Sequence, residues 1–282
     1  MSDDGVGPDG PDGPDGPDGP DGTVRIERHE VGAGGGWVAE LVLDRPRAMN
    51  ALSAAFAGAL RDAAGQVAAQ DGVRAVVLSS SGERAFCVGA DLKERNRLDD
   101  AGLRAQRVVM RAAFRAVLDL PVPAVAAVDG HALGGGLELA LSCDLVVLGD
   151  AAVVGLPEVS VGVIPGGGGT QLLTRRVGWS RAADLVFTAR RIGADEALRL
   201  GVADRVVPAG TARKAVLELA SAIGAHSPVG VRNAKRAMRL GQGLDLAAAL
   251  DVEDAAWQAT AFSADRVEGV RAFTEKRPPR WP

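Results

Sequence analysis

DGHALGGGLELA, at residues 129–140, is the stretch of sequence that decides the fold. It follows the apolar segment AVAAV at residues 124–128, which predicts a buried strand. Glycines at 134–136 let a ligand approach the backbone closely, and exposed N–H groups at a helix start favour negative charge. The stretch therefore predicts a strand, a glycine turn and a helix, with Glu138 one turn into that helix.

A second glycine-rich segment, PGGGGT, occupies residues 165–170 and precedes another expected helix. On its own, each segment fits a tight turn as well as a ligand site. Glu158 lies in GLPE at residues 155–158, shortly before the second run. A single carboxylate is usually a surface charge. Its position beside glycine-rich backbone makes Glu158, like Glu138, a candidate for chemistry.

Strand and helix signals alternate outward from this centre, which predicts an α/β fold. After about residue 208 only helical signals remain, with Thr211 and Ser263 as expected N-caps. Asp265 falls in the first turn after Ser263, where its negative charge interacts favourably with the helix dipole. We expect a tail at 1–22, an α/β core at 23–208 and a helical oligomerisation region at 209–282. The expected core strands are 24–30, 37–43, 73–78, 124–128 and 145–148, and its clearest helices are 53–69 and 100–118.

The charge of the chain is unevenly distributed. The 282 residues carry a net charge of −4, but residues 1–22 hold seven Asp and no basic residue. Without those seven charges the rest of the chain stands at +3, which suits small anionic ligands and gives no strong nucleic-acid footprint. The tail repeats Gly-Pro-Asp, has almost no apolar residue to bury, and is predicted to be disordered.

Several classes of protein are excluded by the composition. Two cysteines, Cys87 and Cys143, cannot build a disulfide framework, and the three histidines stand far apart. No zinc motif, P-loop or serine-hydrolase elbow occurs, so we expect no metal and no cofactor. No secretory signal or membrane-spanning stretch is present, which predicts a cytoplasmic enzyme.

A third segment, FCVGADLKER at residues 86–95, contains a helix start. Asp91 with Glu94 fits a variant of the capping box, so Asp91 is expected to be structural. The N–H of Ala90, just before the cap, could point into a site.

These segments, in this order and spacing, resemble the crotonase, or enoyl-CoA hydratase/isomerase, family. The matching pieces run from about residue 24 to 277, and GADLKER and EKRPPR look most like the 3-methylglutaconyl-CoA hydratase branch. The resemblance implies a spiral of ββα units with a C-terminal helical trimerisation region. It also implies a homotrimer or dimer of trimers. The pieces are LDRP to NAL at 43–52, residues 86–95 and 129–140, CD at 143–144, LPE at 156–158, IPGGGGTQ at 164–171 and FTEKR at 273–277.

The resemblance also implies an active site for an acyl-CoA thioester. The N–H groups of Ala90 and Gly135 would form an oxyanion hole for the thioester oxygen. Glu138 would deprotonate the attacking water, Glu158 would deliver a proton to C2, and the N–H of Gly166 would help to position the water. The implied CoA contacts are Arg47 (where lysine is common), Ala48, Met49, Val88, Ala90, Asp91, Leu92 and Lys93, with Phe273 and Lys276 reaching a neighbour's CoA.

The expected activity is hydration of a 2-enoyl-CoA in fatty-acid or branched-chain amino-acid degradation, with 3-methylglutaconyl-CoA as an alternative substrate. Family isomerases usually keep one acidic residue at the two glutamate positions, and family dehalogenases use other sets. A nucleic-acid-binding, for instance RNA-binding, protein is the alternative from another class. This alternative depends on a row of arginines along one face of the expected helix at 100–118, and a solvent-exposed helix face explains such a row more simply. That face carries Arg104, Arg107, Arg111 and Arg115.

Overall fold

The computed structural model describes residues 22–32 and 35–282, so nearly all of the acidic tail lies outside the described residues. The described strands form two sheets. The larger has the order β1-β2-β3-β5-β7-β10, and the smaller has the order β4-β6-β8-β9. The larger comprises β1 (Thr23–Glu30), β2 (Trp37–Asp44), β3 (Val73–Ser80), β5 (Ala124–Val128), β7 (Leu145–Gly149) and β10 (Arg205–Val207). The smaller comprises β4 (Ala85–Cys87), β6 (His131–Leu133), β8 (Val153–Gly155) and β9 (Ile192–Gly193).

The chain moves between the two sheets in a repeating way. β3, β5 and β7 each join the larger sheet, and the strand that follows each of them joins the smaller one. A helix then leads back to the larger sheet after β4 and after β6. Pairing is parallel except for β1 with β2 and β8 with β9. Each turn of this spiral places the end of a short strand next to the start of a helix.

Both faces of the central strands β2, β3, β5 and β7 are buried, which explains their apolar sequences. On β2, Leu41 and Leu43 point into the main core, whereas Val38 points to a second cluster on the opposite face. α8 (Ala212–Gly224) covers that second face through Val216 and Ala220. The main core is covered by α1 (Ala54–Ala68), α3 (Asp100–Leu118), α4 (Gly135–Leu141), α5 (Gly169–Val177), α6 (Trp179–Thr188) and α7 (Ala194–Leu200).

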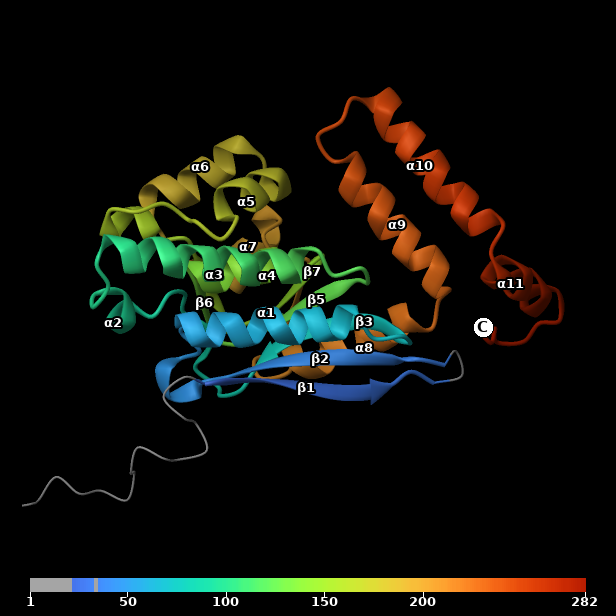
Figure 1. Cartoon of the computed structure of the whole chain (residues 1–282), viewed down its shortest axis with the longest axis horizontal. Coiled ribbons are helices and arrows are strands. Elements are labelled where there is room, and N and C mark those ends of the chain that lie inside the picture. The colour runs from blue at the N-terminus through green and yellow to red at the C-terminus, as the bar shows by residue number, and fades with distance from the viewer. Residues whose placement is uncertain (1–21, 33–34) are drawn as a thin grey trace, which may run out of the picture.

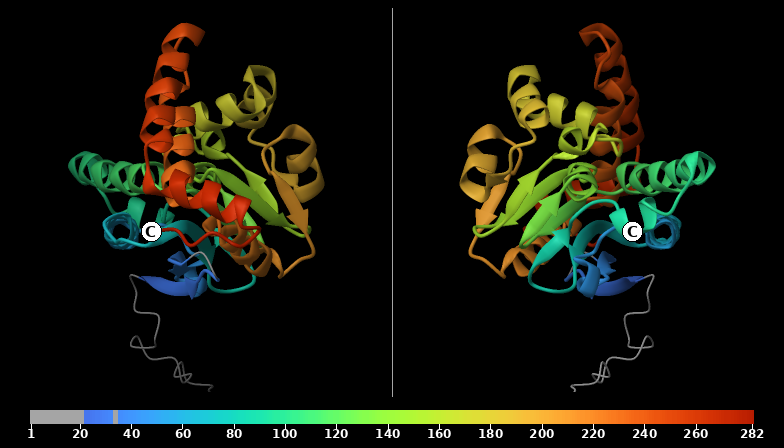
Figure 2. Two further views of the ribbon diagram at one scale, coloured as in Figure 1. Left: turned by 90° about the vertical axis from the view of Figure 1, so that its right-hand side faces the viewer. Right: turned by 90° about the vertical axis from the view of Figure 1, so that its left-hand side faces the viewer.

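Three helices extend away from the sheets, as Figures 1 and 2 show. α9 (Pro228–Gly241) and α10 (Leu246–Ala261) pack side by side, and α11 (Ala264–Thr274) follows them. Large apolar side chains stand exposed along this part, including Trp257, Phe262 and Phe273 at 62%, 83% and 86%. None of the described helices is long and apolar enough to cross a bilayer.

The two predicted N-caps differ in outcome. Ser263 caps α11, since its hydroxyl accepts a hydrogen bond from the amide of Arg266. The Thr211 prediction was wrong, because this residue has φ −112° and ψ 0°, outside the extended region that a capping side chain needs. Its hydroxyl donates to the carbonyl of Pro208 instead, and the carboxylate of Asp129 accepts from the amide of Ala212.

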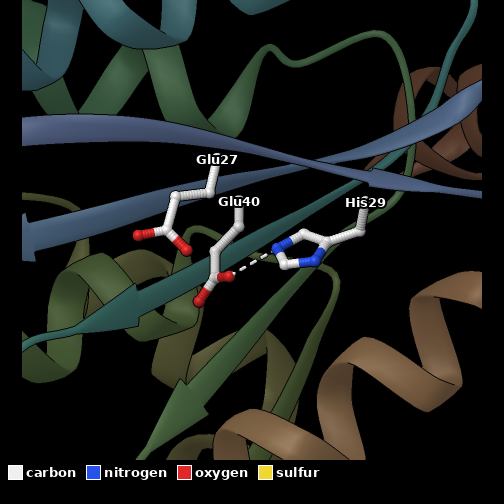
Figure 3. A group of neighbouring side chains, drawn as sticks. All are labelled: Glu27, His29 and Glu40. Carbon is white, nitrogen blue, oxygen red and sulfur yellow. Dashed lines mark hydrogen bonds and ion pairs between the residues drawn. The ribbon is translucent and has the colours of Figure 1, made fainter.

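A cluster of ion pairs joins α8 to strands β1 and β2 of the larger sheet. Glu40, fully buried on β2, accepts hydrogen bonds from Arg213 of α8 and from Ser79. Figure 3 shows His29 and Glu27 beside it, with Nε2 of His29 2.7 Å from Glu40. The three groups Glu27, His29 and Glu40 lie close enough to hold a metal ion. The guanidinium of Arg213 bonds to both glutamates and already supplies positive charge there.

Candidate active site

The glycine turn predicted at 134–136 joins β6 to α4. Gly134 has φ 53° and ψ −126°, a backbone conformation that favours glycine. At Gly136 a Cβ would lie 1.9 Å from the carbonyl oxygen of Cys87, so no side chain fits there. This close packing sets α4 directly against β4 and points Glu138, in its first turn, into the interior.

The second glycine run wraps around the carboxylate of Glu138. The amides of Gly167 and Gly169 both donate 2.7 Å hydrogen bonds to Oε1 of Glu138. Burial raises the pKa of Glu138, while these two amides, the charge of Arg107 and the amide of Gly166 act in the opposite direction. The run thus stabilises the ionised form of an otherwise desolvated carboxylate. Sequence reasoning treated both segments as candidates but did not foresee that one holds the glutamate of the other.

Glu158 begins the 3-10 helix η2 (Glu158–Val161) on the other side of Gly134. A Cβ on Gly134 would come within 3.0 Å of its Oε1. Its Oε2 is buried and has no hydrogen-bond partner among the described residues. Burial raises the pKa of Glu158 to about 7, and the negative charge of Glu138 adds to this shift. The structure therefore brings the two predicted glutamates together in different environments, one rich in donors and one poor.

The amides of Ala90 and Gly135 come from neighbouring segments, the loop after β4 and the start of α4. Gly89 has φ +89°, and a Cβ there would lie 3.0 Å from the nitrogen of Gly135. Gly135 is the first residue of α4, so its N–H has no partner within the helix. Among the hydrogen bonds between described residues, neither Ala90 nor Gly135 uses its amide as a donor. Two donors are thus free close to the carboxylates.

The predicted CoA contacts around residues 47–49 and 88–93 lie next to each other. A parallel bridge pairs Leu52 with Ala90. The amide of Leu52 donates to the carbonyl of Gly89, and the amide of Asp91 donates to the carbonyl of Leu52. Arg45 and Asp91 form an ion pair at 2.8 Å across this junction. The 3-10 helix η1 (Pro46–Ala48) and α2 (Leu92–Arg95) therefore form one surface, with Arg47, Leu92 and Lys93 exposed on it.

Asp91 has the structural role that its sequence predicted. Its carboxylate accepts from the amides of Lys93 and Glu94 at the start of α2. In a full capping box Glu94 would accept a hydrogen bond from the amide of Asp91. Here Glu94 accepts instead from the amide of Ala54, at the start of α1, and from the side chain of Gln106. Burial alone would raise the pKa of Asp91, but Arg45 and the two amides outweigh it and lower that pKa.

Phe273 and Lys276 are not brought to this surface. Both are exposed, and Lys276 follows α11 with φ 53°. Figure 1 shows α11 and α2 at opposite ends of the molecule. Within a single chain, these two residues therefore lie far from the other predicted CoA contacts.

Sequence reasoning missed two side chains of α3. Phe114 lies between the glycine segments, with ring atoms 3.4 Å and 2.7 Å from where a Cβ would stand on Gly135 and Gly167. Arg107, one of the four arginines spaced along α3, is seven residues before Phe114 and shares this side of the helix. Its Nη1 lies 3.2 Å from the corresponding position on Gly166. A helical wheel anchored on the buried residues of α3 could have separated Arg107 from the other arginines.

The site combines a carboxylate held by amide donors, a second carboxyl group with a pKa of about 7 and two amides without an acceptor among the described residues. Such a set of groups is typical of enzymes that use general acid–base catalysis. The chain belongs to the enoyl-CoA hydratase/isomerase family, whose profile matches residues 34–282. YngF of Bacillus subtilis strain 168, named for the same family, is 45% identical over 242 residues, which cover 85% of this chain and 92% of YngF. Human mitochondrial methylglutaconyl-CoA hydratase is 39% identical over 245 residues, covering 86% and 72% of the two chains.

Solved structures confirm the crotonase-type α/β fold that the resemblance implied. A crystal structure of enoyl-CoA hydratase from Bacillus anthracis superimposes with a TM-score of 0.87 at 37% identity. The match covers 92% of this chain and 98% of that one. The family acts on acyl-CoA thioesters.

Proposed function

We propose that this protein hydrates a 2-enoyl-CoA, adding water across the 2,3 double bond to give a 3-hydroxyacyl-CoA. The observation that carries the proposal is the pair of glutamates in unlike environments. Glu138 is held by two amides, whereas Glu158 has a buried free oxygen and a pKa of about 7. Addition of water needs a base for the water and an acid for C2, and this pair offers both at neutral pH.

The proposed reaction uses each group once. Because Oε1 of Glu138 is occupied by amides, Oε2 is the atom that takes a proton from the water as its oxygen bonds to C3. The π electrons move towards the thioester, and the developing charge on its oxygen receives the N–H groups of Ala90 and Gly135. Glu158 then delivers its proton to C2. The proton on Glu138 must return to Glu158 or to solvent before the next turnover, so atoms and charge balance.

The CoA moiety would lie along the surface formed by η1 and α2. Arg47 and Lys93 are exposed there and suit its phosphates, while Ala48, Met49, Val88 and Leu92 flank the pantetheine. Gly166 contributes an amide beside Glu138 and would help to hold the water. No cofactor is required, since CoA belongs to the substrate.

We further propose that the exposed apolar side chains of α10 and α11 pack against other copies of the chain, in a trimer or a dimer of trimers. The neighbour would then supply Phe273 and Lys276. Relatives from both bacteria and mitochondria match the chain, and a cytoplasmic location stays a prediction.

An assay with two substrates separates hydration from isomerisation. Crotonyl-CoA in ¹⁸O-labelled water should lose its conjugated-thioester absorbance and gain labelled 3-hydroxybutyryl-CoA. An isomerase would instead convert 3-hexenoyl-CoA to the conjugated 2-enoyl ester without taking up label. Rapid isomerisation of 3-hexenoyl-CoA with no uptake of label from crotonyl-CoA would overturn the proposal.

A further inference from the structure

Arg107 is exposed on α3, and its guanidinium lies beside the glycine run that holds Glu138. Its Nη1, Cζ and Nη2 atoms lie 3.2, 3.6 and 3.8 Å from the position of a Cβ on Gly166. The adjacent residue, Gly167, contacts Phe114 and the carboxylate of Glu138 in the same way. The guanidinium thus lies beside Gly166, and the carboxylate of Glu138 lies beside the next residue, Gly167.

This arginine forms no hydrogen bond or ion pair within residues 22–32 and 35–282, although its charge acts on Glu138. Arg115 of the same helix, by contrast, pairs with Asp119. A guanidinium presents a fork of N–H donors that matches a carboxylate, and an acyl chain without polar groups would desolvate it with nothing in return. This side of α3 therefore presents an exposed guanidinium beside Glu138 that no side chain of the described residues occupies.

We propose that Arg107 binds a second carboxylate on the acyl group, so that the preferred substrates are 2-enoyl-CoA esters of dicarboxylic acids. The inference deepens the proposed function and depends on it for the placement of the acyl chain. A carboxylate two carbons beyond C3 would bring negative charge close to Glu138 and Glu158. Arg107 offsets that repulsion and fixes the direction in which the chain extends past the double bond.

A role limited to the charge state of Glu138 makes a different prediction. If Arg107 only stabilised ionised Glu138, its loss would slow neutral and anionic substrates to the same extent. If it binds the distal carboxylate, the loss falls on the anionic substrate. The ratio between the two substrates therefore distinguishes the roles, and Arg107→Lys should keep part of the preference because the charge remains.

Binding of saturated esters tests the proposal without requiring turnover. Titration calorimetry would compare glutaryl-CoA with butyryl-CoA on the wild type, Arg107→Leu, Arg107→Lys and the control Arg104→Leu. We expect the wild type to bind glutaryl-CoA at least ~10-fold more tightly, since a charged hydrogen-bonded pair is at stake. Arg107→Leu should abolish the difference while binding butyryl-CoA within ~3-fold of the wild type, and Arg104→Leu should retain the difference.

Turnover of glutaconyl-CoA and crotonyl-CoA by the same four proteins completes the test. Arg107→Leu should lower kcat/KM for glutaconyl-CoA at least ~10-fold more than for crotonyl-CoA. Equal losses on both substrates, or a wild type that binds butyryl-CoA as tightly as glutaryl-CoA, would overturn the assignment. A wild type with the binding preference but no hydration of either ester would instead overturn the proposed function.

Discussion

The main-chain amide of Gly169 donates a 2.7 Å hydrogen bond to Oε1 of Glu138, 31 positions earlier in the chain. A Cβ on Gly169 would lie 2.9 Å from that same oxygen. The residue therefore serves the carboxylate in two ways, by its N–H group and by having no side chain. The placement of this carboxylate therefore depends on a glycine that belongs to another helix.

Gly169→Ala should consequently lower kcat by ~10- to 100-fold, because the carboxylate must move by some tenths of an ångström or more. Affinity for butyryl-CoA should change little. Gly193→Ala is the matched control, since a Cβ there meets nothing within 4 Å. Unchanged steady-state kinetics in Gly169→Ala would show that this hydrogen bond is not needed for turnover.

Removing either carboxylate should stop the reaction without preventing binding. We expect Glu138→Gln and Glu158→Gln each to lower the hydration kcat by ~10²–10⁴. Steady-state kinetics with crotonyl-CoA measures the loss, and calorimetry with butyryl-CoA checks that the site still binds. Near wild-type turnover by either variant would remove that residue from the mechanism.

The pKa of about 7 for Glu158 predicts a basic limb in the pH–rate profile. Hydration requires the protonated acid, so kcat/KM should fall as the pH rises through this pKa, approaching tenfold per unit. In Glu158→Gln, whatever activity remains should lack this limb. A wild-type profile that stays flat from pH 6 to 9 would contradict the assignment of Glu158 as the acid.

The same group should affect stability in the corresponding direction. The folded-state pKa of Glu158 is raised above the usual value of 4.5, so the protonated form favours folding. That contribution is complete below the unfolded pKa and is lost as the pH rises through about 7. The melting temperature of Glu158→Gln, relative to the wild type, should therefore increase between pH 5 and 8. A difference independent of pH would mean that Glu158 is not forced to ionise in a desolvated site.

Arg213→Met should destabilise the fold by about 1–3 kcal/mol at pH 7, since it leaves buried Glu40 without its main donor. Burial by itself would raise the pKa of Glu40, but its hydrogen bonds, that from Arg213 foremost, lower it. The stabilisation should thus be present above the unfolded pKa and disappear as the pH falls through the lowered folded pKa. Urea unfolding at pH 7 and at pH 3 measures both, and adding Glu40→Gln to the Arg213 variant should restore part of the loss.

Lys276 is predicted to act on a neighbouring subunit's ligand. Lys276→Ala should raise KM for CoA thioesters but hardly affect pantetheine thioesters, which lack the nucleotide phosphates. Trimers mixed from Glu138→Gln and Lys276→Ala subunits should contain sites that combine an intact Glu138 with a neighbour's Lys276. Such sites would restore low-KM activity. Mixed trimers with only the summed activity of the parents would place Lys276 within its own subunit or outside any site.

The long elements could be predicted from the sequence, because their apolar periods persist over several turns or residues. The strands at 24–30 and 73–78 and the helix at 100–118 lie within one or two residues of those observed. The smaller sheet could not be predicted, since β4, β6 and β8 have three residues each and carry no period. Nor did composition show that α8 packs on the sheet rather than with the helices after it.

At the site, sequence patterns identified residues but not their relationships. The sequence marks Glu138 and the run at 166–169 as separate candidates, but the contact between them joins successive turns of the spiral and has no local signal. By its spacing in the sequence, Arg107 cannot be told apart from the three other arginines of the same helix. Its distinguishing feature is its alignment with Phe114, which has meaning only once the buried side of α3 is known.

The support of Glu138 by main-chain amides has a consequence for how such an enzyme can diversify. These donors do not depend on the identity of any side chain, so a substitution that leaves the backbone in place cannot remove them. Phe114 and Arg107, by contrast, reach the site with their side chains, which single substitutions on α3 can change. The lining of the site could therefore be changed along α3 while the two amide hydrogen bonds to Glu138 are kept.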